Sequence, residues 1–397
     1  MTISNDNKRM VVLFATIFLV GVGFSIIMPV LPYYAESMGA NAFQLGMLIT
    51  VYAICQFIFA PIWGAYSDRV GRKPVLLAGV LGYAITFILF GFATRLWMLY
   101  LIRIAGGILA CATMPTAMAY VGDSTSLEKR GSAMGMIGAA MGMGMVFGPA
   151  IGGLLSRISL AFPFVFAGLL ALVNFVAVWM LLPESLAREN RVVHKVERAS
   201  LLEGLRTPLA VLFLCICLAS IGESIHHGTF ALFAEAKLSF TAHDIGWAFT
   251  AAGIMMALVQ GLLVGRMINR LGEEKTAGIG IILMGSSFVL ILFMSNILTS
   301  IIFMMVFAAG IGLIRPSLSA AVSKRTSSAQ GAAMGIFNGY DSLGRSIGPM
   351  LGGFMLDQGQ NLGYYTAISI SVLALLTLLI GTRIRGNDES RRKERLV

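Results

Sequence analysis

The sequence predicts an all-α polytopic membrane protein with twelve transmembrane helices in two pseudo-symmetric six-helix bundles. The chain of 397 residues is 57% hydrophobic and only 12% charged, so its polar side chains are too few to cover a water-soluble globule of that size. Twelve segments are apolar over the roughly 20 residues that a helix needs to cross a bilayer. A pattern at 144–153 returns at 344–353, which indicates a duplicated half.

The twelve expected spans alternate with polar connections. They cover residues 10–31, 44–66, 74–93, 97–120, 131–155, 162–182, 209–231, 244–267, 276–294, 299–320, 331–355 and 363–383. The first span follows a polar N-terminus and is too long for the core of a signal peptide, so we expect a permanent helix. An N-terminal six-helix bundle (1–183) and a C-terminal six-helix bundle with a basic cytoplasmic tail (209–397) flank a cytoplasmic linker (184–208).

The distribution of lysine and arginine predicts the orientation of these spans. If the odd-numbered connections lie outside, they contain only Arg95, Arg157 and Lys237. The other basic residues outside the spans then share the opposite face, which the positive-inside rule makes cytoplasmic, together with both termini. The net charge of +10 is therefore a topology signal that points to membrane lipid and requires no nucleic-acid partner.

The repeated pattern predicts close helix packing. In a membrane helix, glycines spaced four apart give a flat face for a neighbouring backbone, and a proline bends the helix. The first copy consists of Gly144, Gly148, Pro149, Gly152 and Gly153. A purely structural packing role and a role in a moving seam both remain open. The second half differs because the same offset places Asp341 against Met141 and Arg345 against Met145, so we expect coupling chemistry in the C-terminal half and the gate in the N-terminal half.

A second motif lies in the loop after the second span, and a degenerate copy lies at 265–275, after the eighth span. Glycines allow a sharp turn there, and an acid among several bases can cap a helix and bind neighbouring charges. We expect a gating motif formed by Gly64, Asp68, Arg69, Gly71, Arg72 and Lys73, with Asp123 and Arg130 on its inner side. A simple positive-inside loop is the alternative.

Charges inside the spans point to ion coupling, because each costs about 2.5–3.5 kcal/mol at the membrane centre. They are Glu223, Asp341, Arg103, Arg345 and Arg315. Glu223 is the first choice as proton carrier, because a carboxyl in an apolar, partly wetted cavity can bind and release a proton near neutral pH. The alternative is a structural ion pair with a basic residue. His226 and His227, three and four residues on, are expected to share the proton. No metal site is expected, because one helix supplies too few ligands.

Asp341 and Arg345 are spaced to form an ion pair on one helix face. The pair can be structural. It can also be a switch, in which protonation of Asp341 frees Arg345 for Glu223 or for a substrate anion. Glu223 is the alternative partner for Arg345.

The twelve spans, the 64–73 loop, Arg103 followed by Gly107, and the 144–153 pattern together resemble the major facilitator superfamily. Within it, the chain resembles the twelve-helix drug:proton antiporter branch of bacterial multidrug and tetracycline exporters. The resemblance implies a monomeric transporter of the cell membrane, not an enzyme, that exchanges protons for a small-molecule substrate by alternating access without a cofactor. It also implies that Arg103 couples proton to substrate movement and that the 144–153 helix keeps the seam proton-tight.

The substrate is not specified by these residues. Tetracycline exporters carry acidic residues in spans one and three, but the corresponding positions here lie near Val20 and Thr86 and are not acidic. Some multidrug exporters carry a further acidic residue at a position that is Gly312 in this chain. The expected cavity residues are Gln56, Phe230, Phe337, Asn338 and Tyr340, and Glu223 favours cationic or zwitterionic amphiphiles. A transporter of a specific metabolite such as a sugar is the alternative. A receptor or an enzyme is less favoured, because no catalytic constellation or phosphate-binding loop is present.

Overall fold

The computed structural model describes residues 5–125, 127–186, 189, 201–207, 209–326 and 330–394. Within these ranges all regular structure is helical, with no strand. Eleven helices among the described residues are long and apolar enough to cross a membrane. The twelfth is α14 (Gln330–Gln358), which contains Asp341 and Arg345. The expected all-α fold with twelve spans is confirmed.

The helices of the first half follow the predicted order but run further at several ends. They are α1 (Asn5–Glu36), α2 (Ala42–Val70), α3 (Arg72–Gly91), α4 (Leu96–Leu109), η1 (Ala110–Ala112), α5 (Thr113–Ser124), α6 (Leu127–Leu155) and α7 (Phe162–Leu181). The short 3₁₀ segment η1 joins α4 and α5 into one span. The extra turns lie at polar ends, where the helix continues beyond the apolar run that the sequence marks.

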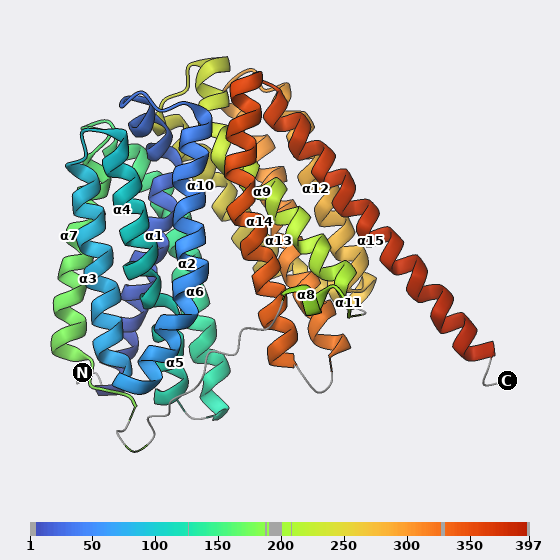
Figure 1. Ribbon diagram of the computed structural model, residues 1–397, viewed down its shortest axis with the longest axis horizontal. Helices are drawn as coiled ribbons and strands as arrows, with labels where there is room; N and C mark the ends of the chain where they lie inside the picture. The colour runs from blue at the N-terminus through green and yellow to red at the C-terminus, as the bar shows by residue number, and fades with distance from the viewer. Residues whose placement is uncertain are drawn as a thin grey trace. The chain divides into compact units, whose positions relative to one another are not determined.

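The helices of the second half repeat this order. They are α8 (Leu201–Gly204), α9 (Ala210–Leu238), α10 (Ala242–Leu258), the π-helical η3 (Val259–Leu263), α11 (Val264–Leu271), α12 (Glu273–Leu292), α13 (Ile297–Arg325), α14 and α15 (Leu362–Glu394). The segments α10, η3 and α11 form one span. Helix α15 extends past its neighbours as a single rod (Figure 1).

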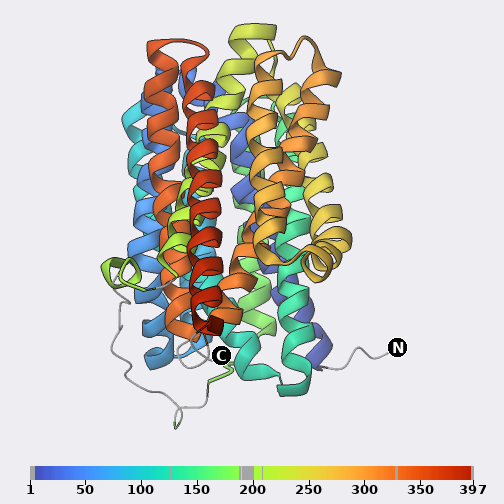
Figure 2. The ribbon, with the colours of Figure 1, turned by 90° about the vertical axis from the view of Figure 1, so that its right-hand side faces the viewer.

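The contacts divide the chain into two compact units. Unit 1 comprises Met1–Glu197 and Ala234–Thr250, and unit 2 comprises Arg198–Phe233 and Ala251–Val397. Within each unit the helices run side by side along one direction (Figures 1 and 2). The end of α9 and the start of α10 belong to unit 1, so each of these helices contributes to both units.

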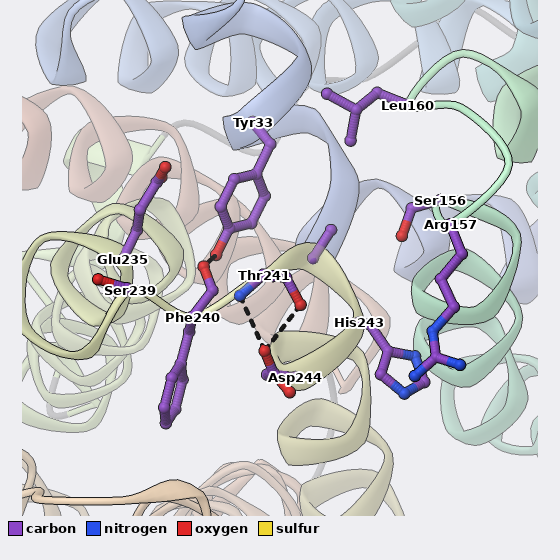
Figure 3. Close-up of a pocket in the computed structure, with 11 residues that line it drawn as sticks. Tyr33, Ser156, Arg157, Leu160, Glu235, Ser239, Phe240, Thr241, His243 and Asp244 are labelled. Carbon is purple, nitrogen blue, oxygen red and sulfur yellow. Dashed lines mark hydrogen bonds between the residues drawn. The ribbon is translucent and has the colours of Figure 1, made fainter.

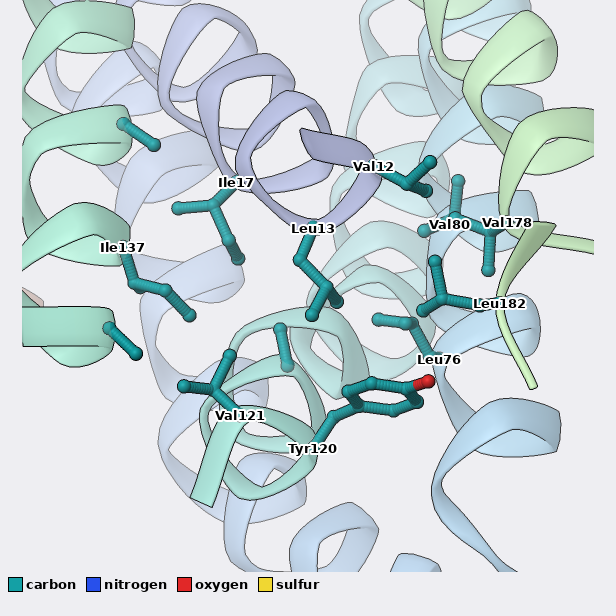
Figure 4. Packing of buried hydrophobic residues seen from close by; sticks show 13 residues of the cluster. Val12, Leu13, Ile17, Leu76, Val80, Tyr120, Val121, Ile137, Val178 and Leu182 are labelled. Carbon is teal, nitrogen blue, oxygen red and sulfur yellow. The ribbon is translucent and has the colours of Figure 1, made fainter. Parts of the chain in front are cut away.

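A hydrophobic core fills unit 1 between α1, α3, α5, α6 and α7 (Figure 4). Leu13, Ile17 and Leu76 are at most 1% exposed, and Tyr120 closes the cluster with its hydroxyl donated to the Pro183 carbonyl at 2.8 Å. Within a bilayer such packing stabilises the bundle through van der Waals contacts between side chains, since lipid tails are as apolar as leucine.

The glycines of the repeated pattern bring helix backbones together in each unit. In unit 1, a Cβ on Gly148 of α6 would lie 2.6 Å from the Val22 carbonyl oxygen of α1. In unit 2, a Cβ on Gly348 of α14 would lie 2.6 Å from the Ile221 carbonyl oxygen of α9. Such contacts are far shorter than a side chain tolerates, so only glycine fits at either position. The sequence repeat therefore corresponds to the same helix packing in both units.

Candidate functional site

Four charged side chains of unit 2 join in one network, which we call the charged network: Glu223, Arg315, Asp341 and Arg345. Asp341 is its centre, since its Oδ2 lies 2.9 Å from Arg315 Nη2 and its Oδ1 lies 3.3 Å from Arg345 Nε. The other end of Arg345 reaches Glu223, with Nη2 3.5 Å from Oε1. These charges come from α9, α13 and α14.

The helix packing places the charged network. Ser220 on α9 donates its hydroxyl to Asp341 Oδ1 at 2.7 Å. A Cβ on Gly344 of α14 would lie 2.8 Å from the Ser220 Cβ, so the glycine seam holds these two helices at hydrogen-bonding distance. The sequence interpretation did not include Ser220. Its signal was its position one turn before Glu223 on a helix that the repeat pairs with α14.

The two carboxylates of the charged network differ in their surroundings. The Asp341 side chain is only 4% exposed and contacts three donors, from Ser220, Arg315 and Arg345. The Glu223 side chain is 13% exposed, and its ion-pair contact among the described residues is the longer one with Arg345. A proton on Asp341 would disrupt three charge-assisted contacts, whereas a proton on Glu223 would disrupt the one with Arg345.

The two neighbouring histidines do not share one environment. His226 is fully buried, with Nδ1 3.1 Å from the Tyr364 hydroxyl and Nε2 3.0 Å from the Met304 sulfur, and its ring packs on Phe307 at 4.1 Å between centroids. His226 is therefore packed in the core of unit 2, and its expected role in proton transfer stays a prediction. His227 is half-buried and lies within electrostatic reach of Glu223 and Arg345.

Three of the expected cavity residues are instead buried. Phe230 is 0% exposed and packs on His226, and Phe337 is 1% exposed. Tyr340 stacks on Phe213 with ring centroids 5.7 Å apart. These rings pack in the core of the structure, and their place in a substrate cavity stays a prediction. Gln56 is half-buried and Asn338 is exposed.

Arg103 lies on α4 in unit 1 and is 5% exposed. Its guanidinium carbon lies 5.3 Å from the ring centroids of both Tyr52 and Phe90. Within the described residues, Arg103 Nε has no hydrogen-bond partner. The two rings supply a cation–π environment in place of a carboxylate.

The loop motif builds a compact polar cluster between α2 and α3. Gly71 adopts a φ of 113°, which a residue with a side chain rarely adopts, and it turns the chain so that Arg72 begins α3. Arg72 is buried, and its guanidinium lies 2.5 Å from Asp68 and donates to Asp123 at 2.9 Å and to the Ser67 hydroxyl at 2.6 Å. Arg69 is exposed, and the side chain of Arg130 lies outside the described part of the structure.

Glu184 completes this cluster. Its carboxylate accepts hydrogen bonds from the backbone N–H groups of Arg72 at 2.8 Å and Lys73 at 3.3 Å, which stabilises the free N-terminus of α3. Lys73 Nζ donates to the Trp179 carbonyl at 2.8 Å. The sequence interpretation assigned Glu184 to the linker and so missed this contact, because a capping partner so distant in sequence leaves no local pattern.

Arg72→Ala is expected to lower the free energy of unfolding by about 1–2 kcal/mol, because it leaves two partly exposed carboxylates without their shared partner. Arg69→Ala is the matched control, since Arg69 is exposed on the same turn and should change stability by less than about 0.5 kcal/mol. The measurement is the unfolding midpoint of the purified protein in detergent. Equal midpoints for both variants would contradict this prediction.

A cavity of about 680 Å³ lies in unit 1 at the end of α1 (Figure 3). The Tyr33 hydroxyl donates to the Phe240 carbonyl at 2.7 Å, and Asp244 accepts hydrogen bonds from Thr241 at the start of α10. Arg157 and His243 lie on its other side (Figure 3). The sequence interpretation did not predict this cavity.

The end of α6 also meets α10 within unit 1. A Cβ on Gly246 would lie 2.6 Å from the Pro149 carbonyl oxygen and 3.0 Å from Gly153 Cα, so the two backbones touch. His243 Nδ1 lies 3.3 Å from the Gly153 carbonyl oxygen and adds a polar contact. The repeated pattern therefore makes two seams in unit 1, with α1 and with the first turns of α10.

Comparison with known proteins decides the family of this arrangement. A family model described as Major Facilitator Superfamily matches residues 13–211 and again 212–396. The chain belongs to the Major Facilitator Superfamily. It is accordingly a multi-pass membrane transporter and not an enzyme.

Two curated relatives align with most of the length of this chain. Multidrug resistance protein 2 of Bacillus subtilis (strain 168) is 31% identical over 360 residues, which cover 89% of this chain and 90% of the relative. Tetracycline resistance protein, class D, of Salmonella ordonez is 33% identical over 364 residues, which cover 89% of this chain and 91% of the relative.

Solved structures show the same fold at low identity. The nucleoside transporter NupG matches with a TM-score of 0.78 at 14% identity, covering 96% of this chain and 99% of that chain. The human organic anion transporter MFSD10 (TETRAN) matches with a TM-score of 0.67 at 23% identity, covering 94% and 99%. At these identities the likeness establishes the fold alone.

Proposed function

We propose that this chain is a proton-coupled exporter of drugs or amphiphilic small molecules that works by alternating access in the cell membrane, with both termini cytoplasmic. The observation that carries the proposal is the charged network, in which Glu223 has a single arginine partner inside the membrane span of α9. Charged groups within a span are costly and persist where they move ions or substrates. The names of the relatives, which refer to multidrug and tetracycline resistance, support export.

In this proposal Glu223 carries the proton and Asp341 stays ionised. Protonation of Glu223 removes the attraction that holds one end of Arg345, while Asp341 retains the other end through the Nε contact. Arg345 is then free to turn about that contact, which changes the polarity of the surface beside α9. The proton thus alters the position of a cation, and that movement is the coupling step.

The remaining motifs supply the mechanical parts of the proposal. The bundles at 1–183 and 209–397 act as the two moving bodies, and the linker at 184–208, which lies mostly outside the described residues, connects them. The Arg72 cluster steadies the inner end of unit 1, and the seams of α6 exclude water between packed backbones. The absence of a carboxylate at Val20 and Thr86 argues against a metal–tetracycline substrate.

The test is a flux assay in proteoliposomes with an imposed proton gradient. We expect the gradient to drive uphill movement of amphiphilic dyes opposite to the protons, and we expect no such movement of sugars. Vesicles whose gradient has been dissipated by an ionophore are the control. Gradient-driven movement of a sugar without any dye movement would support the metabolite transporter instead and overturn the proposal.

A further inference from the structure

Arg103 differs from the buried Arg72 and from the half-buried Arg345. Arg72 and Arg345 each lie within 4 Å of two carboxylates. No carboxylate among the described residues forms an ion pair with Arg103, although its side chain is more deeply buried than either and its Nε is unpartnered. A buried guanidinium without a counterion is costly, and the cost is recovered when an anion binds it.

The depth of Arg103 limits what that anion can be. Arg103 lies two turns after the start of α4 at Leu96, which places it about 10 Å along the helix. A lipid phosphate would have to leave the headgroup layer to reach it. A small molecule in transit carries its charged group to that depth as part of its path.

We infer that Arg103 binds the anionic group of the substrate and that the preferred substrates are amphiphiles bearing a carboxylate, zwitterions included. This inference rests on the proposed function. The guanidinium offers planar, paired donors that match a carboxylate, and the rings of Tyr52 and Phe90 lie 5.3 Å from its carbon without using those donors in an ion pair.

The charge of unit 2 supports this substrate class. Glu223 alone favours a cationic substrate, but Glu223 is paired with Arg345, and Asp341 is paired with Arg315 and Arg345. Two acids and two arginines leave the charged network without net charge. Among the described residues within the spans of unit 1, Arg103 is a deeply buried cation whose Nε has no hydrogen-bond partner.

The test measures equilibrium binding of a matched pair of ligands without any proton gradient. N-dansyl-phenylalanine carries a carboxylate, and its methyl ester keeps the same aromatic body without the charge. Fluorescence titration of the wild-type protein in phosphatidylcholine nanodiscs is expected to give at least about tenfold tighter binding of the acid than of the ester, as one charge-assisted contact provides.

Three variants locate that preference. Arg103→Gln should bind acid and ester equally, Arg103→Lys should keep a reduced preference, and Arg95→Gln, at the exposed start of the same helix, should keep the wild-type preference. The Lys variant and ester binding by the Gln variant both report on folding. An equal affinity of the wild-type protein for acid and ester would overturn the inference, and so would an unchanged preference in Arg103→Gln.

The lipid source is tested by adding phosphatidylglycerol to the nanodiscs. If the acid preference survives, the substrate supplies the anion; if the anionic lipid abolishes it in the wild-type protein, a headgroup occupies Arg103 and the substrate assignment is overturned. Failure of this inference is separable from failure of the proposed function, because dye flux under a proton gradient is measured independently of acid-versus-ester binding.

Discussion

Glu223→Gln is expected to abolish proton-driven uphill transport while leaving substrate binding intact. The amide has nearly the shape of the carboxyl group but cannot take up a proton in the coupling step. Arg345 loses its Glu223 contact yet keeps Asp341, so the rest of the charged network stays in place. The measurement is dye transport against a concentration difference in proteoliposomes, with dye binding measured on the same preparation.

Two further variants serve as a control and a comparison for Glu223→Gln. Glu235→Gln changes another carboxyl of α9 outside the charged network and should retain transport. Asp341→Asn removes the charge that faces two arginines and the Ser220 hydroxyl, so we expect it to lower the yield of folded protein as well as transport. Wild-type uphill transport by Glu223→Gln would exclude Glu223 as the proton carrier and move that role to Asp341.

Gly148→Ala is expected to produce a large loss of stability. The new Cβ would lie 2.6 Å from the Val22 carbonyl oxygen and would also collide with the Ser25 hydroxyl, so α6 and α1 must separate. Overpacking of this kind costs about 1–3 kcal/mol or more. The measurement is the thermal unfolding midpoint in detergent.

The control lies on the same helix. A Cβ on Gly142 would meet no heavy atom within 4 Å in the described part of the chain, so Gly142→Ala should match or exceed the wild-type midpoint. The repeat supplies a second pair, Gly348→Ala against Gly335→Ala, with the same expected contrast. If Gly148→Ala and Gly142→Ala unfold at the same temperature, the backbone seam is not as tight as described.

The number of helices was predictable because length and apolarity determine what can cross a bilayer. Helix α14 shows the limit of hydropathy, since its three charged residues and low apolarity keep it out of the eleven apolar helices found among the described residues. The segment 331–355 was already among the twelve expected spans, and the repeat supports it, because its glycine pattern matches that of α6. Sequence symmetry therefore strengthens the prediction of a span whose charges weaken its hydropathy signal.

The members of the charged network were predictable, but only part of its pairing was. Asp341 and Arg345 are four residues apart on one helix, which brings them together whatever the fold. The Arg315 contact with Asp341 joins α13 to α14, and no local spacing encodes it. Such contacts depend on how the helices are rotated against each other.

Helix rotation also explains why several of the expected site residues pack in the core. His226 and His227 lie one turn after Glu223, on opposite sides of the line that runs through Glu223 parallel to the helix axis, because 3.6 residues complete a turn. His226 turns into the aromatic core, while His227 stays within reach of the charges. The rings of Phe230 and Tyr340 likewise face the core. Residue type alone does not distinguish the wall of a cavity from a packed interior.

The balanced charges of the network have a consequence for the membrane voltage. With Glu223 and Asp341 ionised, the formal charges of the four residues cancel, so an electric field exerts little net force on them. One proton on Glu223 makes the set singly positive, and moving one charge across the membrane is worth about 2.3 kcal/mol per 100 mV. A negative interior then draws the proton-loaded form inward and leaves the unloaded form unaffected. The membrane voltage would therefore favour one direction of the transport cycle, in addition to any difference in pH.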